Sequence, residues 1–99
     1  MTIITDKTGR KIGVQRLDPG DFLDLLEAAG PASANSGFVG YASIVSAVRD
    51  IDGVPVPFPS SKEDVKALAR KVGADAIGMV ATALGEADKT GDTMAVAGN

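Results

Sequence analysis

Carboxylates are the clustered side chains that could do chemistry in this sequence, which contains no histidine and no cysteine. Without those residues there is no imidazole for acid–base catalysis, no thiol nucleophile, no disulfide, and no zinc site of the usual kind. Four acids recur at three-residue intervals: Asp18, Asp21, Asp24 and Glu27. On a helix that spacing places them along one exposed ridge, whereas a calcium site needs ligands that surround the ion. We therefore predict a solvated helix face and no metal site.

A second group of acids, Asp50 and Asp52, flanks Ile51. A paired-carboxylate acid–base site needs a pocket that separates the two pKa values, and no part of the sequence implies one. Asp52-Gly53 is explained by turn geometry, and no phosphate-binding loop motif occurs. The sequence therefore predicts no catalytic residues and no cofactor, so we expect a protein that is not an enzyme.

Length and charge narrow the function further. The 99 residues suit one domain, which we place at residues 1–85, and the aperiodic residues 86–99 are predicted to form a flexible tail. A net charge of −3 argues against nucleic acid as the main partner, because phosphate binding needs a basic surface. The sequence contains no run of about 18 apolar residues, the length that could span a membrane, and the N-terminus lacks a signal-peptide pattern.

The first elements are two short strands and a helix. Asp6 and Gly9 suit a type I turn followed by a left-handed residue, so residues 2–16 are predicted to form a β-hairpin. Such a hairpin needs a third strand or helices to pack against. Asp18 is a good N-cap for the helix that carries the acidic ridge, and this helix should end at Gly30.

Residues 38–49 are predicted to form a second helix that is apolar nearly all round. It has no charge before Arg49. Its larger apolar residues are Phe38, Val39, Tyr41, Ile44, Val45 and Val48. A helix of this kind is usually buried, but in a small domain part of its surface could instead meet a partner.

Prolines alternate with apolar residues in the next segment. The segment reads Val54, Pro55, Val56, Pro57, Phe58, Pro59. Because alternate N–H groups of an extended chain share an edge, the prolines strip one edge of donors and leave the other open. The pattern is typical of an edge strand, and it is our candidate for the third strand of the hairpin sheet. Its apolar stripe is either core or a docking arm for a partner.

Two further helices complete the periodic part of the chain. Ser60 and Glu63 form a capping-box pattern that opens a helix ending at Gly73, and residues 75–84 form a fourth helix. A single helix kinked at Gly73 is the alternative. The charged side chains of the third helix should face water: Lys62, Glu63, Lys66, Arg70 and Lys71. The elements together predict an α+β, mainly α fold, in which an N-terminal β-hairpin precedes four short helices, with a short edge strand between helices 2 and 3.

Over residues 11–84 the sequence resembles the small tail assembly chaperones of long-tailed bacteriophages. The order of elements is similar: hairpin, acidic helix, apolar helix, turn and strand, then two short helices broken at Gly73. The residues that carry the resemblance are Val48, Ile51, Asp52, Gly53, Pro55, Val56, Pro59 and Gly73.

The resemblance implies a mostly helical, non-enzymatic viral protein, made in the infected cell and therefore present in the host cytoplasm. Members of the family coat the tape-measure protein, keep it soluble and help the tail tube subunits assemble. The implied partners are the tape-measure protein and the tail tube protein, and we expect a homo-oligomer. A tape-measure protein is a long helical chain with apolar stripes, so helix-in-groove contact is the expected mode of binding.

We expect partner binding through the apolar side chains of the second helix and the proline-rich strand: Phe38, Val39, Tyr41, Ile44, Val45, Val48, Val54, Val56 and Phe58. Binding should be insensitive to salt, because these contacts are apolar. Two other functions fit the same sequence. One is a small structural subunit of the virion, such as a tail-completion or tube-associated protein, and the other is a small phage regulatory protein that docks on a host factor.

Overall fold

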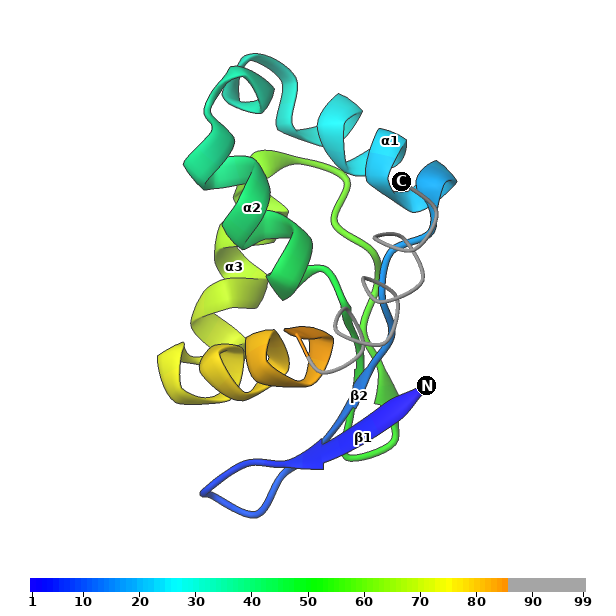
Figure 1. The fold of residues 1–99 in the computed structure, drawn as a ribbon, viewed down its shortest axis with the longest axis vertical. Helices are drawn as coiled ribbons and strands as arrows, with labels where there is room; N and C mark the ends of the chain where they lie inside the picture. The colour runs from blue at the N-terminus through cyan, green and yellow to red at the C-terminus, as the bar shows by residue number, and fades with distance from the viewer. Residues whose placement is uncertain (86–99) are drawn as a thin grey trace, which may run out of the picture.

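A four-stranded antiparallel sheet forms one side of the molecule, and helices pack against one of its faces (Figure 1). The computed structural model describes residues 1–85, so the tail predicted at residues 86–99 lies outside the described residues. The strands, in their order in the sheet, are β1 (Thr2–Thr5), β2 (Lys11–Val14), β3 (Val48–Ile51) and β4 (Val54–Pro55). The helices are α1 (Pro19–Ala29), the 3-10 helix η1 (Gly30–Ala34), α2 (Ser36–Val45), α3 (Lys62–Val72) and a last helix over residues 74–85. The predicted α+β, mainly α class is confirmed.

The N-terminal hairpin forms as the sequence predicts. β1 and β2 pair with Ile4 opposite Ile12. The Gly9 N–H donates to the Asp6 carbonyl at 3.0 Å, and the Asp6 N–H donates to the Arg10 carbonyl at 2.9 Å. Gly9 has φ +93°, a conformation that side-chain-bearing residues adopt only with strain. The turn glycine therefore sets the register of the hairpin.

The third strand of the sheet is not the one that the sequence predicts. α2 ends at Val45, and the next four-residue element is β3, which lies between β2 and β4. The prediction of helix up to Arg49 is therefore wrong at its C-terminal end. Val48 lies opposite Val14 and is buried. Pairing with β2 and burial outweigh the helical spacing of these residues, because tertiary context overrides local preference in strands.

β4 is an edge strand, as predicted, but its proline-free edge is already paired. Val54 lies opposite Ile51, and the Val56 N–H donates to the Arg49 carbonyl at 2.9 Å. The edge that faces away from β3 carries the prolines, which have no N–H to offer. β3 therefore pairs with the edge of β4 that the sequence suggested for docking of a partner strand. β4 is the last strand on this side of the sheet.

Side-chain caps begin the first two main helices. The Asp18 carboxylate accepts a hydrogen bond from the Asp21 N–H at 2.7 Å and begins α1 as predicted. The Asn35 side-chain oxygen accepts from the Phe38 N–H at 3.1 Å. Because Asn35 is the cap, α2 begins at Ser36, two residues before the predicted start.

α3 begins one residue later than the predicted capping box implies. The cap is Ser61, whose hydroxyl accepts from the Asp64 N–H at 3.1 Å. The N–H and hydroxyl of Ser60 both donate to the Asp64 carboxylate, at 3.1 and 2.8 Å, so Asp64 takes the role predicted for Glu63. α3 ends at Gly73, where φ is +87°, and the last helix then runs at a steep angle to α3 (Figure 1). Two separate helices, not one kinked helix, therefore complete the described chain.

Two adjoining apolar clusters form the core. The main cluster lies between the sheet and the helices and comprises Ile12, Val14, Val45, Ala47, Val48, Ile51, Leu68, Val72, Ala76, Ile77 and Val80. The second cluster comprises Leu25, Ala42 and Val65, and Phe38 and Phe58 pack against it. Leu17 packs against both clusters, so it connects α1 and the second cluster to the sheet.

Candidate functional site

The side chains predicted to bind a partner differ widely in exposure. Val45 and Val48 are 0% and 2% exposed and belong to the main core cluster, so their assignment to a binding surface is corrected. The half-buried residues are Phe38, Val39, Ile44, Val56 and Phe58. Tyr41 and Val54 are 50% and 63% exposed. Most of the apolar stripe is therefore used by the fold, and a smaller part reaches the surface.

Phe58 is a core residue rather than the tip of a docking arm. It packs against the second cluster, and the guanidinium carbon of Arg49 lies 5.5 Å from its ring centre. Val54, by contrast, lies in β4 at the edge of the sheet, away from α2 (Figure 1). The structure therefore does not bring the predicted strand and helix residues into one surface.

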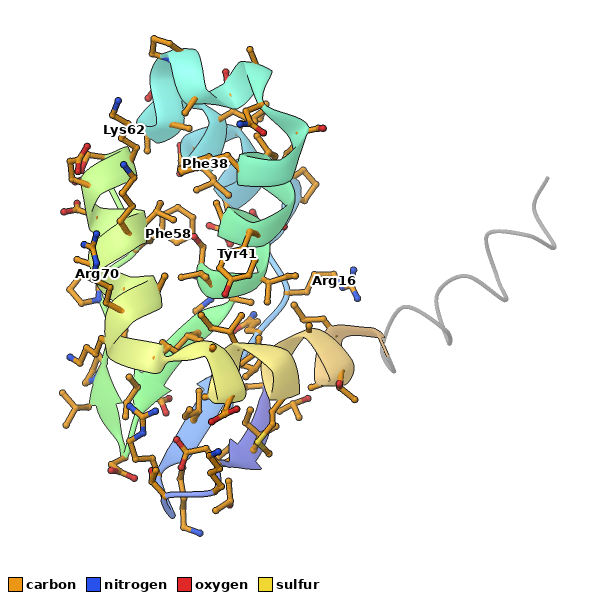
Figure 2. All side chains as sticks on the ribbon, turned by 90° about the vertical axis from the view of Figure 1, so that its left-hand side faces the viewer. Arg16, Phe38, Tyr41, Phe58, Lys62 and Arg70 are labelled. Carbon is orange, nitrogen blue, oxygen red and sulfur yellow. The ribbon has the colours of Figure 1, made fainter. Side chains whose placement is uncertain are left out.

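A groove between α2 and α3 does bring apolar side chains together at the surface (Figure 2). It has a volume of about 300 Å³. Its lining residues are Phe38, Tyr41 and Ala42 from α2, and Val65, Lys66, Ala69 and Arg70 from α3. Ala42 and Val65 are buried beneath it, while Tyr41 stands at its rim. Small side chains beneath an exposed aromatic rim let another helix approach closely, as in helix-in-groove recognition.

The two walls of this groove differ in charge. Lys62, Lys66 and Arg70 recur every four residues along α3 and are exposed, and Figure 2 shows the first and last of them on this helix. Within residues 1–85, none of the three forms an ion pair. α2, with the sequence SGFVGYASIV, carries no charged side chain. One wall is therefore cationic and the other is neutral.

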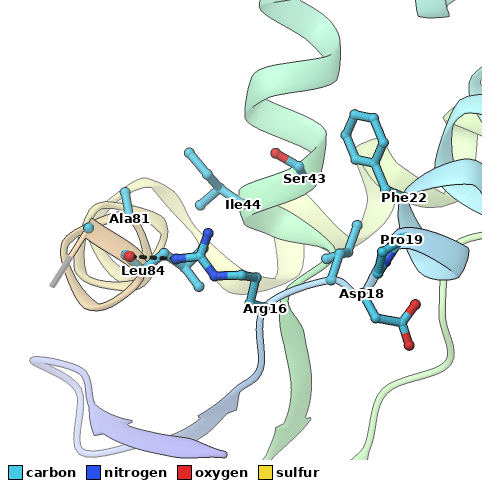
Figure 3. Close-up of a pocket in the computed structure, with 10 residues that line it drawn as sticks. Arg16, Asp18, Pro19, Phe22, Ser43, Ile44, Ala81 and Leu84 are labelled. Atoms are coloured by element: carbon cyan, nitrogen blue, oxygen red, sulfur yellow. Dashed lines mark hydrogen bonds between the residues drawn. The ribbon is translucent and has the colours of Figure 1, made fainter. Parts of the chain in front are cut away.

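A second cavity, of about 520 Å³, lies where the start of α1, α2 and the last helix meet (Figure 3). It is lined mainly by apolar residues, including Leu17, Phe22 and Ile44. The Arg16 guanidinium donates to the Leu84 carbonyl at 2.9 Å, and Asp18 caps α1. Because both charged side chains here already hold the fold together, the cavity offers no pair of groups poised for catalysis.

The carboxylate of Asp6 has the most strongly shifted pKa, and its role is structural. The hydroxyl of Thr8, followed by Arg10, donates to this carboxylate and lowers its pKa to about 2. The guanidinium of Arg10 also donates to the carbonyls of Lys71 and Val72, at 3.0 and 2.7 Å. This network ties the hairpin turn to the end of α3.

The other acids also serve the fold or face solvent. The Asp21 carboxylate accepts from the guanidinium of Arg49 at 2.9 Å. Asp52 has φ +52° in the β3–β4 turn and accepts from the Lys11 N–H at 2.9 Å, in line with the turn predicted from its sequence. Over the described part of the chain, no three potential ligands converge on a position that could hold a metal ion.

The groove contains residues that sequence reasoning missed as a site. The sequence predicts that Lys66 and Arg70 lie on the solvated face of the third helix, and Val65 and Ala69 are apolar positions beside them. The spacing of Lys62, Lys66 and Arg70 beside those apolar positions is the signal that could have indicated a cationic border. Only the structure shows that α2 lies on the other side of the groove from these cations.

None of the helices within residues 1–85 is long and apolar enough to cross a membrane. Comparison of the chain with protein-family models, curated proteins and solved structures gives no match.

Proposed function

We propose that this protein is a tail assembly chaperone of a long-tailed bacteriophage, and that it binds helices of the tape-measure protein in the α2–α3 groove. The groove carries the proposal: it is apolar, open to solvent and bounded by two helices. A surface of this kind suits an amphipathic helix better than a small substrate. The resemblance to the chaperone family supports a tape-measure protein as the source of this helix.

The groove would act by covering the apolar stripe of its partner. Removing apolar surface from water contributes about 25 cal/mol per Å², so an uncovered stripe on a long helix tends to self-associate. One short groove covers only a few turns, and each contact is therefore weak. Several copies of the protein along one partner would give stable coverage through their combined binding, which fits the expected homo-oligomer.

The test is co-expression with the tape-measure protein encoded nearby. We expect the tape-measure protein to become more soluble and to elute with this chain on size exclusion. Purified phage particles should lack the chain by mass spectrometry, because a chaperone leaves before the particle is complete. If the tape-measure protein is no more soluble and no complex elutes, the chaperone proposal fails, and a chain retained in particles would support a structural subunit.

Two substitutions test whether the groove is the binding surface. Tyr41→Glu places a charge at the rim of the groove, on a side chain that is already half exposed and so need not disturb the core. Leu23→Glu is the matched control, because Leu23 is a 64% exposed apolar residue on α1. We expect Tyr41→Glu alone to reduce complex formation. Equal losses in both variants would argue against the groove.

A further inference from the structure

Within residues 1–85, the cations along the α3 wall of the groove form no ion pair with a carboxylate, and the same is true of Lys11 and Lys71. Elsewhere, Lys7 pairs with Asp75, and the guanidinium groups of Arg10 and Arg49 each pair with an aspartate. The chain has a net charge of −3, so acidic side chains are in excess. Among residues 1–85, however, Lys62, Lys66 and Arg70 have no such partner.

The positions of these cations match the geometry of a bound helix. They recur every four residues along α3, which corresponds to a rise of about 6 Å per step. Acidic side chains with the same four-residue spacing on a neighbouring helix would repeat at the same interval. Lys66 and Arg70 line the groove directly, one turn apart. A helix seated between α2 and α3 would therefore present one flank to a row of cations.

We propose that the helix recognised by this groove carries acidic side chains along one flank of its apolar stripe, the flank that faces α3. The other flank, which faces the uncharged α2, needs no charge. This inference rests on the proposed function, because it describes the partner of the same groove. It also replaces the expectation that binding is insensitive to salt, since exposed ion pairs are screened by salt.

A nucleic acid or an anionic lipid surface would also meet the cations, but it fits the groove less well. Both would leave the apolar lining between Phe38 and Ala69 without a matching surface. An amphipathic helix satisfies the apolar lining and the cationic wall together.

The test uses synthetic helical peptides of about 20 residues with one shared leucine stripe, long enough to form helix when bound. One peptide carries glutamates every four residues on one flank, and the other carries lysines there. Fluorescence anisotropy measures their binding to the full-length protein. We expect the glutamate peptide to bind about tenfold more tightly at low salt, with each exposed pair contributing modestly. The preference should shrink at about 0.5 M salt, where the screening length is only a few ångströms.

A charge reversal makes the test specific to the groove. Lys66→Glu/Arg70→Glu should invert the preference, so that the lysine peptide binds more tightly. Lys11→Glu/Lys71→Glu is the matched control, because it changes the net charge equally at exposed positions that lie outside the groove lining and, within residues 1–85, form no ion pair. This control should keep the preference for the glutamate peptide. Melting temperatures of both variants establish that they fold.

Equal binding of the two peptides, or an unchanged preference in Lys66→Glu/Arg70→Glu, would overturn the inference. So would displacement of the glutamate peptide by a single-stranded oligonucleotide or by phosphatidylglycerol vesicles more readily than by unlabelled peptide. The chaperone proposal is judged separately by co-expression. If the wild-type chain and the charge-reversed variant both keep the tape-measure protein soluble, the function stands and the charge inference fails. If the wild-type chain does not keep the tape-measure protein soluble but still binds the glutamate peptide more tightly, the chaperone proposal fails and the charge inference stands.

Discussion

Asp6 is a carboxylate whose environment could be mistaken for that of a catalytic residue. It is buried, and its pKa is lowered by hydrogen bonds from the Thr8 hydroxyl and from Arg10. Shifted pKa values are common at active sites, but structural networks shift them as well. Here the partners of Asp6 belong to its own turn, and Arg10 continues the network to the end of α3. Asp6 therefore stabilises the contact between hairpin and helix.

Asp6→Asn should lower the melting temperature at neutral pH and weaken its dependence on pH in acid. The pKa of Asp6 is about 2 in the folded protein against an ordinary value of 3.8. Its contribution to stability is therefore present above pH 3.8 and is lost as the pH falls towards 2. Thermal unfolding at a series of pH values from about 5 to about 2 measures this dependence of the melting temperature on pH. The two pKa values set that range. Part of the slope should remain, because the pKa of Asp64 is also lowered by the Ser60 hydroxyl.

Asp24→Asn is the control for this measurement, since Asp24 is exposed on α1. It should keep the acid dependence of the wild-type protein. If Asp6→Asn were to unfold along the same pH curve as the wild type, the network around Asp6 would not contribute to stability.

Phe58→Ala should destabilise the fold by about 3 kcal/mol, the lower end for a buried phenylalanine, because the ring is only half buried. The lost contacts are those with the second apolar cluster and with the guanidinium of Arg49. Urea unfolding measures the change. Val54→Ala is the control, because Val54 is exposed at the sheet edge and should have little effect. A stable Phe58→Ala variant with weakened partner binding would instead restore the docking-arm interpretation.

At the level of elements, the sequence predicted what local signals determine. The hairpin turn depends on Asp6 and Gly9, α1 on its Asp18 cap, and the end of α3 on Gly73, and each signal lies within a few residues of its effect. β3 was missed because its formation depends on β2, which is more than thirty residues earlier in the chain. Helical spacing around Val48 could not reveal that distant partner.

The candidate site was predictable in part for the same reason. The apolar character of α2 is visible in the sequence, and so is the four-residue spacing of cations in α3. These two features form one groove only because α2 and α3 lie side by side. That arrangement results from packing in the core clusters. Burial of Val45 and Val48 likewise follows from packing on the sheet. The sequence therefore indicated the helix that lines the groove, but the predicted binding residues included side chains that the core already uses.

The contact between β2 and β3 makes a further prediction. Gly13 lies opposite Asp50, and a Cβ atom added at Gly13 would lie 2.6 Å from an Asp50 carboxylate oxygen. Alanine normally suits a strand better than glycine, by about 0.5–1 kcal/mol. Gly13→Ala should therefore be destabilising in the wild-type protein and neutral or stabilising in an Asp50→Ala background. A double-mutant cycle by urea unfolding should give a coupling of about 1 kcal/mol. Additive effects would show that the carboxylate simply moves aside.

On the scale of the whole molecule, one chain segment has to serve both the core and the surface. α2 supplies Val45 to the main cluster, Ala42 to the second cluster, and Tyr41 to the rim of the groove. Its other exposed positions, Ser36, Gly37 and Gly40, are small, while Val39 and Ile44 are half buried. The apolar surplus that the sequence suggested is therefore divided among three uses, and only the last is available to a partner.

The core formed by the described residues leads to a prediction about a shortened chain. Within residues 1–85, every buried residue of the main cluster lies at or before Val80, and Leu84 packs against that cluster. A chain ending at Gly85 should therefore melt within a few degrees of the full-length protein, because residues 86–99 contain little bulky apolar surface. A chain ending at Gly73 should not fold, since it loses Ala76, Ile77 and Val80 from the core. Thermal unfolding followed by circular dichroism compares the three chains. A drop of many degrees on removing only residues 86–99 would mean that these residues pack on the domain and that its boundary lies beyond Gly85.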